Sequence, residues 1–203
     1  MKKEEIISHF NLNKIQIYKI EHFVSKIINH NQHTNLVGKS TIENIWDRHV
    51  LDCLQLSKHI NKKKLKILDL GTGAGLPGVL LSILGYENVT MIDSVKKKAD
   101  FVKTIIKDLS LTAKIQNNRI EKSLIPDHEI IVSRALAPLS KLLTYALLHS
   151  NKNTTSLFLK GRNVNNELEM AKNNFLFDFK IYESISIGDG CILQIKKIKK
   201  KND

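Results

Sequence analysis

The chain of 203 residues contains little cysteine and no long apolar run. Its two cysteines, Cys53 and Cys191, lie far apart and form no disulfide framework, which fits a reducing compartment. No stretch of eighteen apolar residues occurs, so we expect no membrane-spanning helix. The segment Lys2-Lys3-Glu4-Glu5 is charged where a secretory leader would become apolar, so we expect no leader. These absences predict a cytoplasmic protein.

Metal-binding patterns and aromatic residues are also scarce. The eight histidines show no metal-ligand spacing, and His30 and His33 have no acidic or cysteine neighbours, so we predict no metal site. Aromatic residues make up 6% of the chain. That is few for the lining of a closed pocket around a small-molecule substrate, which disfavours such a substrate without excluding it.

Positive charge, in contrast, is abundant. Lys and Arg total 32 against 20 Asp and Glu, which gives a net charge of +12. This balance fits a polyanionic partner such as RNA, although a lysine-rich composition alone would also produce it. Only four of the basic residues are arginine, namely Arg48, Arg119, Arg134 and Arg162. Because arginine offers a planar, bidentate donor, these positions indicate either a recognition surface or structural ion pairs.

The most informative segment is 66–78, where a short apolar strand runs through Asp69 into a glycine-rich loop. The loop glycines are Gly71, Gly73, Gly75 and Gly78. Glycine lets the backbone approach a ligand closely, and the apolar run 76–84 opens a helix whose free N–H groups point back at the loop. The segment therefore predicts a nucleotide-type pocket.

Two kinds of cofactor are compatible with this loop. Gly73, Gly75 and Gly78 match G-x-G-x-x-G, and Asp93 lies twenty residues after Gly73, as in dinucleotide sites. Asp69, however, would repel a diphosphate but suit a sulfonium centre. Read from Asp69, the loop is Asp-x-Gly-x-Gly-x-Gly, which resembles motif I of the S-adenosylmethionine (SAM) methyltransferases. SAM is favoured, and an NAD(P)-dependent oxidoreductase stays open as an alternative.

The pattern along the chain predicts one α/β domain, with a helical extension at 1–61 and a cofactor-binding core at 62–203. The predicted strands are 66–70, 88–93, 112–116, 128–133 and 154–159. The predicted helices of the core are 76–85, 96–109, 138–149 and 163–174. Strands and helices that alternate in this way predict a parallel, Rossmann-like sheet.

The end of the chain breaks this alternation. Two extended runs, 178–187 and 190–198, are separated only by Gly188-Asp189-Gly190, which leaves no room for a helix. We therefore predict an antiparallel hairpin there. A mostly parallel sheet that finishes in an antiparallel hairpin resembles the class I SAM-dependent methyltransferase fold more than an all-parallel NAD fold.

Several short stretches together resemble one family, the ribosomal RNA small-subunit methyltransferase G family, also called glucose-inhibited division protein B. The stretches run from Asn35-Leu36-Val37 to the final hairpin. They include Arg48-His49-Val50-Leu51-Asp52-Cys53, Gly71–Gly78 with its Gly-Leu-Pro-Gly ending, Ile92-Asp93-Ser94, Asn118-Arg119-Ile120-Glu121, Ser133-Arg134-Ala135 and Leu159-Lys160-Gly161. The departures are small: Cys53 stands where serine is usual, Ala74 where proline is common, and Lys96–Lys98 where an arginine is often seen.

The resemblance implies a SAM-dependent methyltransferase that modifies N7 of a guanine in 16S ribosomal RNA, conventionally guanine 527 in the 530 loop. The partner would be the rRNA, the small ribosomal subunit or an assembly intermediate, and we expect a monomer. The implied cofactor contacts are Asp69, Gly71, Gly73, Gly75, Leu76, Asp93, Ile120, Glu121 and Arg134. Alternatives are a small-molecule SAM-dependent methyltransferase and a non-catalytic ribosome-binding protein that retains the fold.

Arg134 follows the fourth predicted strand, where class I enzymes place the group nearest the transferred methyl. This chain has Ser-Arg-Ala there, and not the Asn-Pro-Pro-Tyr-like residues of enzymes that methylate exocyclic amines. Guanine N7 carries a lone pair and no proton, so we predict that Arg134 positions the reactants and that no general base is needed. The RNA-facing candidates are Arg48, His49, Arg119, Lys160 and Arg162.

Overall fold

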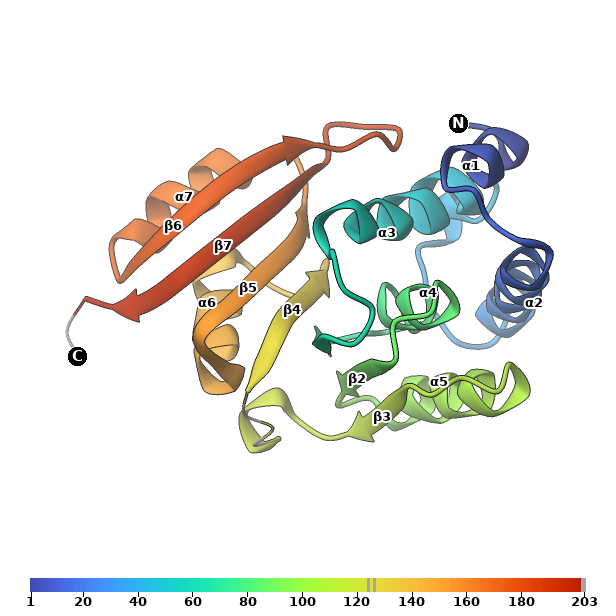
Figure 1. The fold of residues 1–203 in the computed structure, drawn as a ribbon, viewed down its shortest axis with the longest axis horizontal. Helices are drawn as coiled ribbons and strands as arrows, with labels where there is room; N and C mark the ends of the chain where they lie inside the picture. The colour runs from blue at the N-terminus through green and yellow to red at the C-terminus, as the bar shows by residue number, and fades with distance from the viewer. Residues whose placement is uncertain (124, 126, 202–203) are drawn as a thin grey trace.

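The computed structural model describes residues 1–123, 125 and 127–201 (Figure 1). The last two residues of the predicted core, 202–203, lie outside this range. The strands are β1 (Lys66–Leu70), β2 (Asn88–Asp93), β3 (Lys114–Asn117), β4 (His128–Arg134), β5 (Ser150–Lys160), β6 (Phe175–Glu183) and β7 (Cys191–Lys200). The α-helices are α1 (Lys3–His9), α2 (Lys14–Asn31), α3 (Asp52–Leu54), α4 (Gly78–Ile83), α5 (Lys96–Asp108), α6 (Leu139–His149) and α7 (Val164–Lys172).

The strands form one sheet in the order β3-β2-β1-β4-β5-β7-β6. The first five strands in this order run parallel, whereas β7 is antiparallel to both β5 and β6. The predicted mostly parallel sheet with a terminal antiparallel hairpin is therefore confirmed. From β1 the chain first adds β2 and β3 on one side of that strand, and it then crosses over to add β4 and β5 on the other side. The strand order therefore reverses at β1. Open α/β sheets bind ligands at this switch point, outside the carboxyl ends of the strands.

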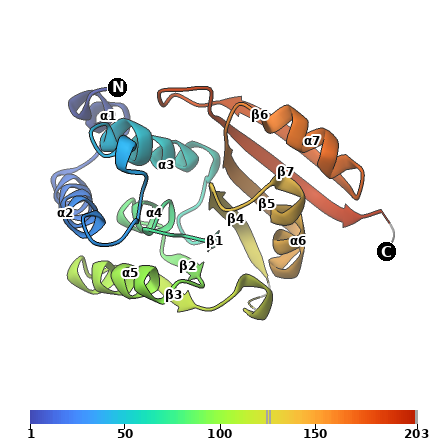
Figure 2. The same ribbon diagram turned by 180° about the vertical axis from the view of Figure 1, so that it is seen from behind.

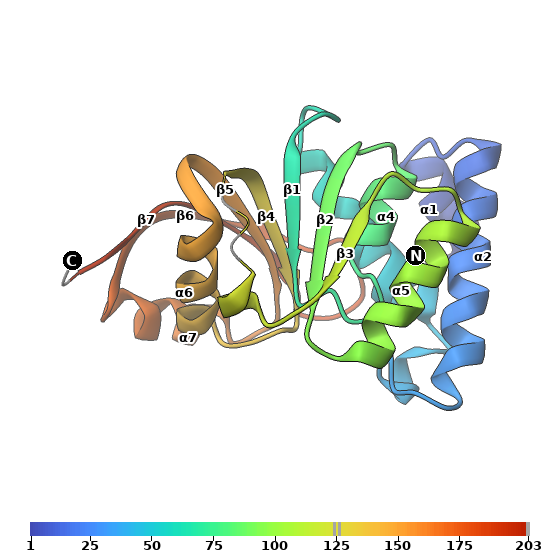
Figure 3. The ribbon, with the colours of Figure 1, turned by 90° about the horizontal axis from the view of Figure 1, so that it is seen from below.

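Alternate residues of the strands feed two hydrophobic cores on opposite faces of the sheet. Ile67 and Val132 join the core that contains residues of α2, α4 and α5. Leu68 and Ile131 join the core that contains residues of α6 and α7. Figure 3 shows the sheet lying between these two groups of helices. A strand buried on both faces reads as a continuous apolar run, which is why the sequence locates β1 and β4 well.

The N-terminal region packs on the α4–α5 side of the sheet (Figure 2). The predicted helical extension is not regular throughout, because residues 39–59 form a succession of short helical turns. A 3-10 turn η1 (Lys39–Thr41) precedes a π-helical segment η2 (Trp46–Leu51), the short α3 and a second 3-10 turn η3 (Gln55–His59). A further 3-10 turn, η4 (Ile120–Lys122), follows β3. Within the described part of the chain, none of the helices combines the length and the apolarity that crossing a membrane requires.

The turn of the β6–β7 hairpin is longer than predicted. Pairing stops at Glu183 and resumes at Cys191, so the turn comprises residues 184–190, which we call the 184–190 loop. This loop reaches across to the helical segment 46–55 (Figure 1). The backbone N–H of Ile187 donates to Asp47 Oδ2 at 2.7 Å, and that of Ile185 donates to Gln55 Oε1 at 3.1 Å. These bonds replace strand pairing, which explains why the extended run 184–187 is not part of β6.

Candidate functional site: two adjoining cavities

Asp69 supports the glycine loop after β1 on the side that faces the protein interior. This side chain is fully buried, and its Oδ2 accepts hydrogen bonds from Thr72 Oγ1 at 2.5 Å and from the Gly78 N–H at 2.8 Å. Burial raises the pKa of Asp69 to about 7, and the two hydrogen bonds oppose that rise. The Asp69 carboxylate therefore ties the start of α4 to the loop from behind.

Three loop glycines, Gly71, Gly75 and Gly78, have neighbours within 3.0 Å of the position a Cβ would take. A Cβ on Gly78 would lie 2.5 Å from Met91 Cγ and 2.8 Å from Asp69 Oδ2. Gly75 has a φ of +92°, and a Cβ there would lie 2.6 Å from Val79 Cγ2. Gly73 also has a positive φ, +58°, but nothing lies within 4 Å of the position its Cβ would take. The loop is thus packed tightly on its protein side and open at Gly73.

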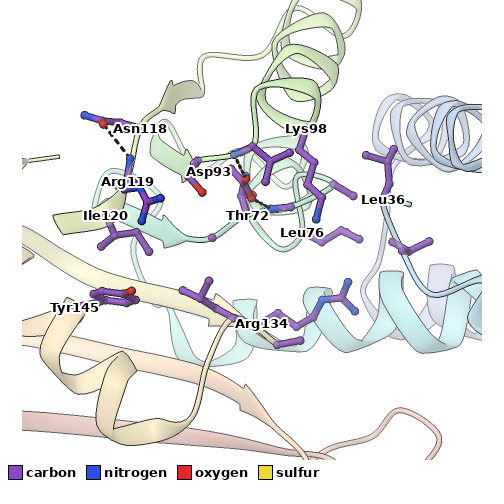
Figure 4. A pocket seen from close by; sticks show the side chains of 18 of the residues that line it. Leu36, Thr72, Leu76, Asp93, Lys98, Asn118, Arg119, Ile120, Arg134 and Tyr145 are labelled. Carbon is purple, nitrogen blue, oxygen red and sulfur yellow. Dashed lines mark hydrogen bonds between the residues drawn. The ribbon is translucent and has the colours of Figure 1, made fainter. Parts of the chain in front are cut away.

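A first cavity of about 550 Å³ opens above this loop (Figure 4). That volume is within the usual range for small-molecule sites. Its walls come from the ends of β1, β2 and β4, from η4 and α6, and from residues 36–38. Of the predicted cofactor contacts, it is lined by Gly71, Gly73, Leu76, Asp93, Ile120, Glu121 and Arg134. Asp69 and Gly75 lie behind the wall, where they shape the loop.

Asp93 is the carboxylate at the end of β2, and both of its oxygens have backbone partners. Oδ2 accepts from the Gly73 N–H and Oδ1 accepts from the Val95 N–H, each at 2.8 Å. The side chain therefore orients the glycine loop and caps the approach to α5, while it still lines the cavity. Asp93 thus supports the glycine loop and also forms part of the cavity wall.

Glu121 and Ile120 lie on the opposite wall. Tyr145 of α6 donates its hydroxyl to Glu121 Oε1 at 3.0 Å, and hydrogen bonds to the carboxylate lower the pKa of Glu121. Tyr145 lines the cavity as well, although the sequence analysis places it only within the predicted helix 138–149 and assigns it no role. Ile120 offers an apolar surface beside these polar groups, an arrangement that suits a flat heterocycle with polar edges.

The far wall consists of residues that the sequence does not assign to the site. Leu36, Val37 and Gly38 line the first cavity. They are held there by Asn31, a buried side chain at the end of α2 whose Oδ1 accepts from the Leu36 N–H at 2.8 Å and the Val37 N–H at 2.9 Å. The sequence feature that could have assigned these residues to the site is the family-like stretch Asn35-Leu36-Val37. The N-terminal region therefore completes the cavity.

A second cavity, of about 390 Å³, adjoins the first. His49, Arg134 and Ala135 line both cavities, and we call these three residues the shared wall. The second cavity is formed by segments distant in sequence: the helical segment near Arg48, the end of β5 with residues 160–162, and the 184–190 loop. Three of the four arginines of the chain, Arg48, Arg134 and Arg162, line it, whereas Arg119 lines the first cavity.

The shared wall is organised by a chain of hydrogen bonds. Arg134 Nη1 lies 2.7 Å from His49 Nδ1, and His49 Nε2 lies 2.6 Å from Thr41 Oγ1, which donates to the Gly38 carbonyl at 2.6 Å. Arginine is always a donor, so His49 Nδ1 is the acceptor and the Nε2 proton points to Thr41. Burial, together with Arg134 and Arg48 nearby, lowers the pKa of His49 to about 3. His49 is therefore neutral at physiological pH, and it fixes Arg134 in place.

The remaining RNA-facing candidates differ in how exposed their side chains are and in whether other residues hold them. Arg162 and Arg119 are exposed at the cavity mouths. Arg48 is exposed, but its Nη1 donates to the Ile187 carbonyl at 2.6 Å and so fastens the 184–190 loop. Lys160 departs from expectation: its side chain is only 8% exposed, and its Nζ contacts Glu167 Oε2 at 2.5 Å and the Ala137 carbonyl at 3.2 Å. Because both partners hold the ammonium, Lys160 braces the cavity wall more than it faces solvent.

Neither cysteine faces the cavities. Cys53 and Cys191 are both buried, and burial raises the pKa of each thiol. Only the thiolate is an effective nucleophile, so neither side chain is suited to covalent attack on a base.

Comparison with known proteins agrees with this geometry. The family model described as rRNA small subunit methyltransferase G matches residues 16–191. A ribosomal RNA small subunit methyltransferase G of Rickettsia prowazekii (strain Madrid E) is 38% identical over 184 residues, which covers 91% of this chain and 95% of that protein.

Solved structures show the same fold. A TehB-like SAM-dependent methyltransferase from Corynebacterium glutamicum superposes with a TM-score of 0.58 at 18% identity, over 73% of this chain and 88% of that one. A mutant of MtNAS solved in complex with S-adenosylmethionine gives a TM-score of 0.63 at 12% identity, over 97% and 84% of the two chains. The fold is thus that of the class I SAM-dependent methyltransferases.

Proposed function

Because the chain belongs to the rRNA small subunit methyltransferase G family, we propose that it methylates N7 of a guanine in 16S rRNA, conventionally guanine 527 in the 530 loop. Membership of the family establishes the broader activity, SAM-dependent methylation of rRNA. The position on the base, the nucleotide and the roles of individual residues are parts of the proposal.

The first cavity has the features that SAM requires. The open backbone at Gly73 admits a ligand close to the loop, the Asp93 carboxylate can accept from ribose hydroxyls, and Ile120 with Glu121 offers an apolar surface and a polar edge for adenine. Bound SAM supplies a methyl group on a positively charged sulfur. In this assignment Arg134 lies at the boundary with the second cavity and contacts either the cofactor carboxylate or a substrate oxygen.

The observation that carries the N7 assignment is the chemistry of the shared wall. His49 cannot take a proton readily, because its Nδ1 already accepts from Arg134 and its pKa is lowered to about 3. Arg134 is permanently charged and cannot serve as a base. These two residues of the shared wall therefore favour an acceptor atom that is nucleophilic without losing a proton. Guanine N7 satisfies this condition, and catalysis then consists of alignment and electrostatic positioning.

The positive lining of the second cavity supports an RNA substrate. Arg48, Arg134 and Arg162 are suited to phosphate groups beside the modified base, because a guanidinium binds phosphate in a bidentate manner. An N7 atom inside folded rRNA becomes accessible when its nucleotide is single-stranded or extruded.

Mass mapping of 16S rRNA from a strain that lacks the gene tests this function. We expect one N7-methylguanine to disappear and to return when the gene is restored. If every N7-methylguanine persists, the proposed function is wrong. Calorimetry with S-adenosylhomocysteine and with NADH addresses the oxidoreductase alternative, and we expect heat of binding only with the former.

A further inference from the structure

The second cavity contains a carboxylate where a site for a polyanion would be expected to have none. Asp52 lines this cavity together with Arg48, Arg134, Lys160 and Arg162, and the exposed Asp189 of the 184–190 loop lines it as well. Its side chain is 19% exposed. A carboxylate among four cationic side chains weakens the attraction for phosphate, so electrostatic steering alone does not account for its position.

Asp52 lines the second cavity, and only one of its two carboxylate oxygens has hydrogen-bond partners among the described residues. Oδ1 accepts from Gln55 Nε2 at 3.1 Å and from Ser186 Oγ at 3.2 Å. Oδ2 makes no hydrogen bond to any residue that the structure describes, and Arg134 Nη1 lies 3.9 Å from it. Burial raises the pKa of Asp52, whereas Arg134 lowers it, so the guanidinium favours the ionised form. The result is a fixed carboxylate with an open acceptor beside the shared wall.

We propose that Asp52 Oδ2 reads the Watson–Crick edge of the acceptor guanine, an inference that rests on the proposed function. When N7 is turned toward the shared wall, the opposite edge of the purine points into the second cavity. Guanine presents two adjacent donors on that edge, N1–H and N2–H₂, and one carboxylate oxygen has lone pairs for both. Adenine and cytosine present a ring-nitrogen acceptor at the corresponding position, which a carboxylate repels. Asp52 thereby selects guanine over adenine, although both purines carry N7.

The test compares guanine with inosine, which retains N7 and N1–H but lacks the N2 amino group. Single-turnover methylation rates are measured on two small-subunit RNAs that differ only in the target base. We expect the wild-type enzyme to prefer guanine by about tenfold or more, since hydrogen bonds to charged groups are strong. In Asp52→Asn the preference should fall below about threefold.

Asp47→Asn is the matched control. Asp47 fastens the same 184–190 loop through the Ile187 N–H, but it does not line the second cavity. We expect this variant to keep the wild-type preference for guanine. If Asp47→Asn lowers the preference as much as Asp52→Asn does, Asp52 acts only by anchoring the loop and the proposal is wrong.

Two further outcomes separate this proposal from the proposed function. Equal wild-type rates on guanine and inosine would overturn the role of Asp52 even if Asp52→Asn did not fold, while N7 methylation itself would stand. Absence of methyl transfer by the wild-type enzyme to either RNA, with S-adenosylhomocysteine still bound, would instead overturn the N7 function and the proposal with it.

Discussion

The two cavities are built in different ways from the same sheet. The first depends on backbone geometry: the glycine loop, the Asp93 carboxylate that holds it, and the ends of neighbouring parallel strands. The second depends on side chains of helix, strand and loop that are distant in the sequence; Arg48 and the Ile187 carbonyl, for example, are 139 residues apart. Only the shared wall belongs to both.

This difference separates two kinds of recognition. Backbone groups and short spacing suit a cofactor that is the same in every enzyme of the fold, since the loop can be formed locally. Convergent arginines and the Asp52 carboxylate suit one particular acceptor, because such a set can be changed without disturbing the glycine loop. Variants of the first cavity should therefore affect cofactor binding, and variants of the second should affect RNA.

The largest effect is expected for Asp93→Ala. The substitution removes the carboxylate that accepts from Gly73 and Val95 and that lines the first cavity, so the affinity for S-adenosylhomocysteine should fall about 10- to 100-fold. Calorimetry measures this change. Asp100→Ala is the control, because Asp100 pairs with Lys96 on the exposed side of α5, the helix that follows Asp93 in the chain. An unchanged affinity in Asp93→Ala would exclude Asp93 from the cofactor site.

Arg134→Ala should affect both cavities, because Arg134 lines each of them. We expect the methylation rate to fall at least about tenfold, which corresponds to roughly 1.4 kcal/mol of transition-state stabilisation. Arg134→Lys keeps the charge but loses the planar guanidinium that donates a hydrogen bond to His49, so it should recover only part of the rate. Single-turnover kinetics provide the measurement. Wild-type kinetics in Arg134→Ala would remove this residue from the site.

Arg48→Ala should affect only the second cavity. The loss of the hydrogen bond to the Ile187 carbonyl and of one cation should weaken RNA binding about fivefold, or about 1 kcal/mol. Filter binding at a fixed salt concentration measures it, and Lys103→Ala removes the same charge from an exposed position on α5. If S-adenosylhomocysteine binding falls as much as RNA binding, the two cavities are not separable in this way.

His49 should give a small pH-dependent effect. Its folded pKa of about 3 lies below the ordinary value of 6.5, so the stability it contributes is complete above pH 6.5 and is lost as the pH falls toward 3. Between pH 7.5 and 5.5 the wild-type protein should lose about 1 kcal/mol more of its free energy of unfolding than His49→Gln. Urea unfolding at both pH values measures the difference. Equal losses would mean that His49 is not held neutral.

Much of the fold is predictable from the sequence because it follows from local patterns. Buried parallel strands such as β1 and β4 are centred on apolar residues, and the alternation with helices leads to the observed sheet. The errors arise where distant contacts override local preference. The 184–190 loop leaves the sheet because Asp47 and Gln55 supply hydrogen bonds to its backbone, and no local feature reveals those partners.

In the site, too, the sequence predicts the positions of residues better than the contacts that their side chains make. Gly73, Leu76 and Asp93 line the first cavity as predicted, whereas Asp69 does not. The spacing places Asp69 at the strand end, but burial directs its carboxylate to Thr72 and Gly78. Its expected repulsion of a diphosphate therefore loses its basis, and membership of the family carries the choice of SAM over NAD. Tyr145 lacked any local signal that distinguishes it from an ordinary helical residue, and Asp52 was marked only as a member of the family-like stretch 48–53.

The strand–glycine loop–helix unit, the terminal hairpin and the family resemblance can be recognised from short stretches of the chain, because each depends on residues close together in the sequence. The closure of the first cavity by residues 36–38, and the meeting of three arginines and Asp52 in the second, become evident only in the folded protein. The physical reason is that backbone conformation responds to near neighbours, whereas a side-chain constellation forms only when the sheet order and the loop contacts are complete.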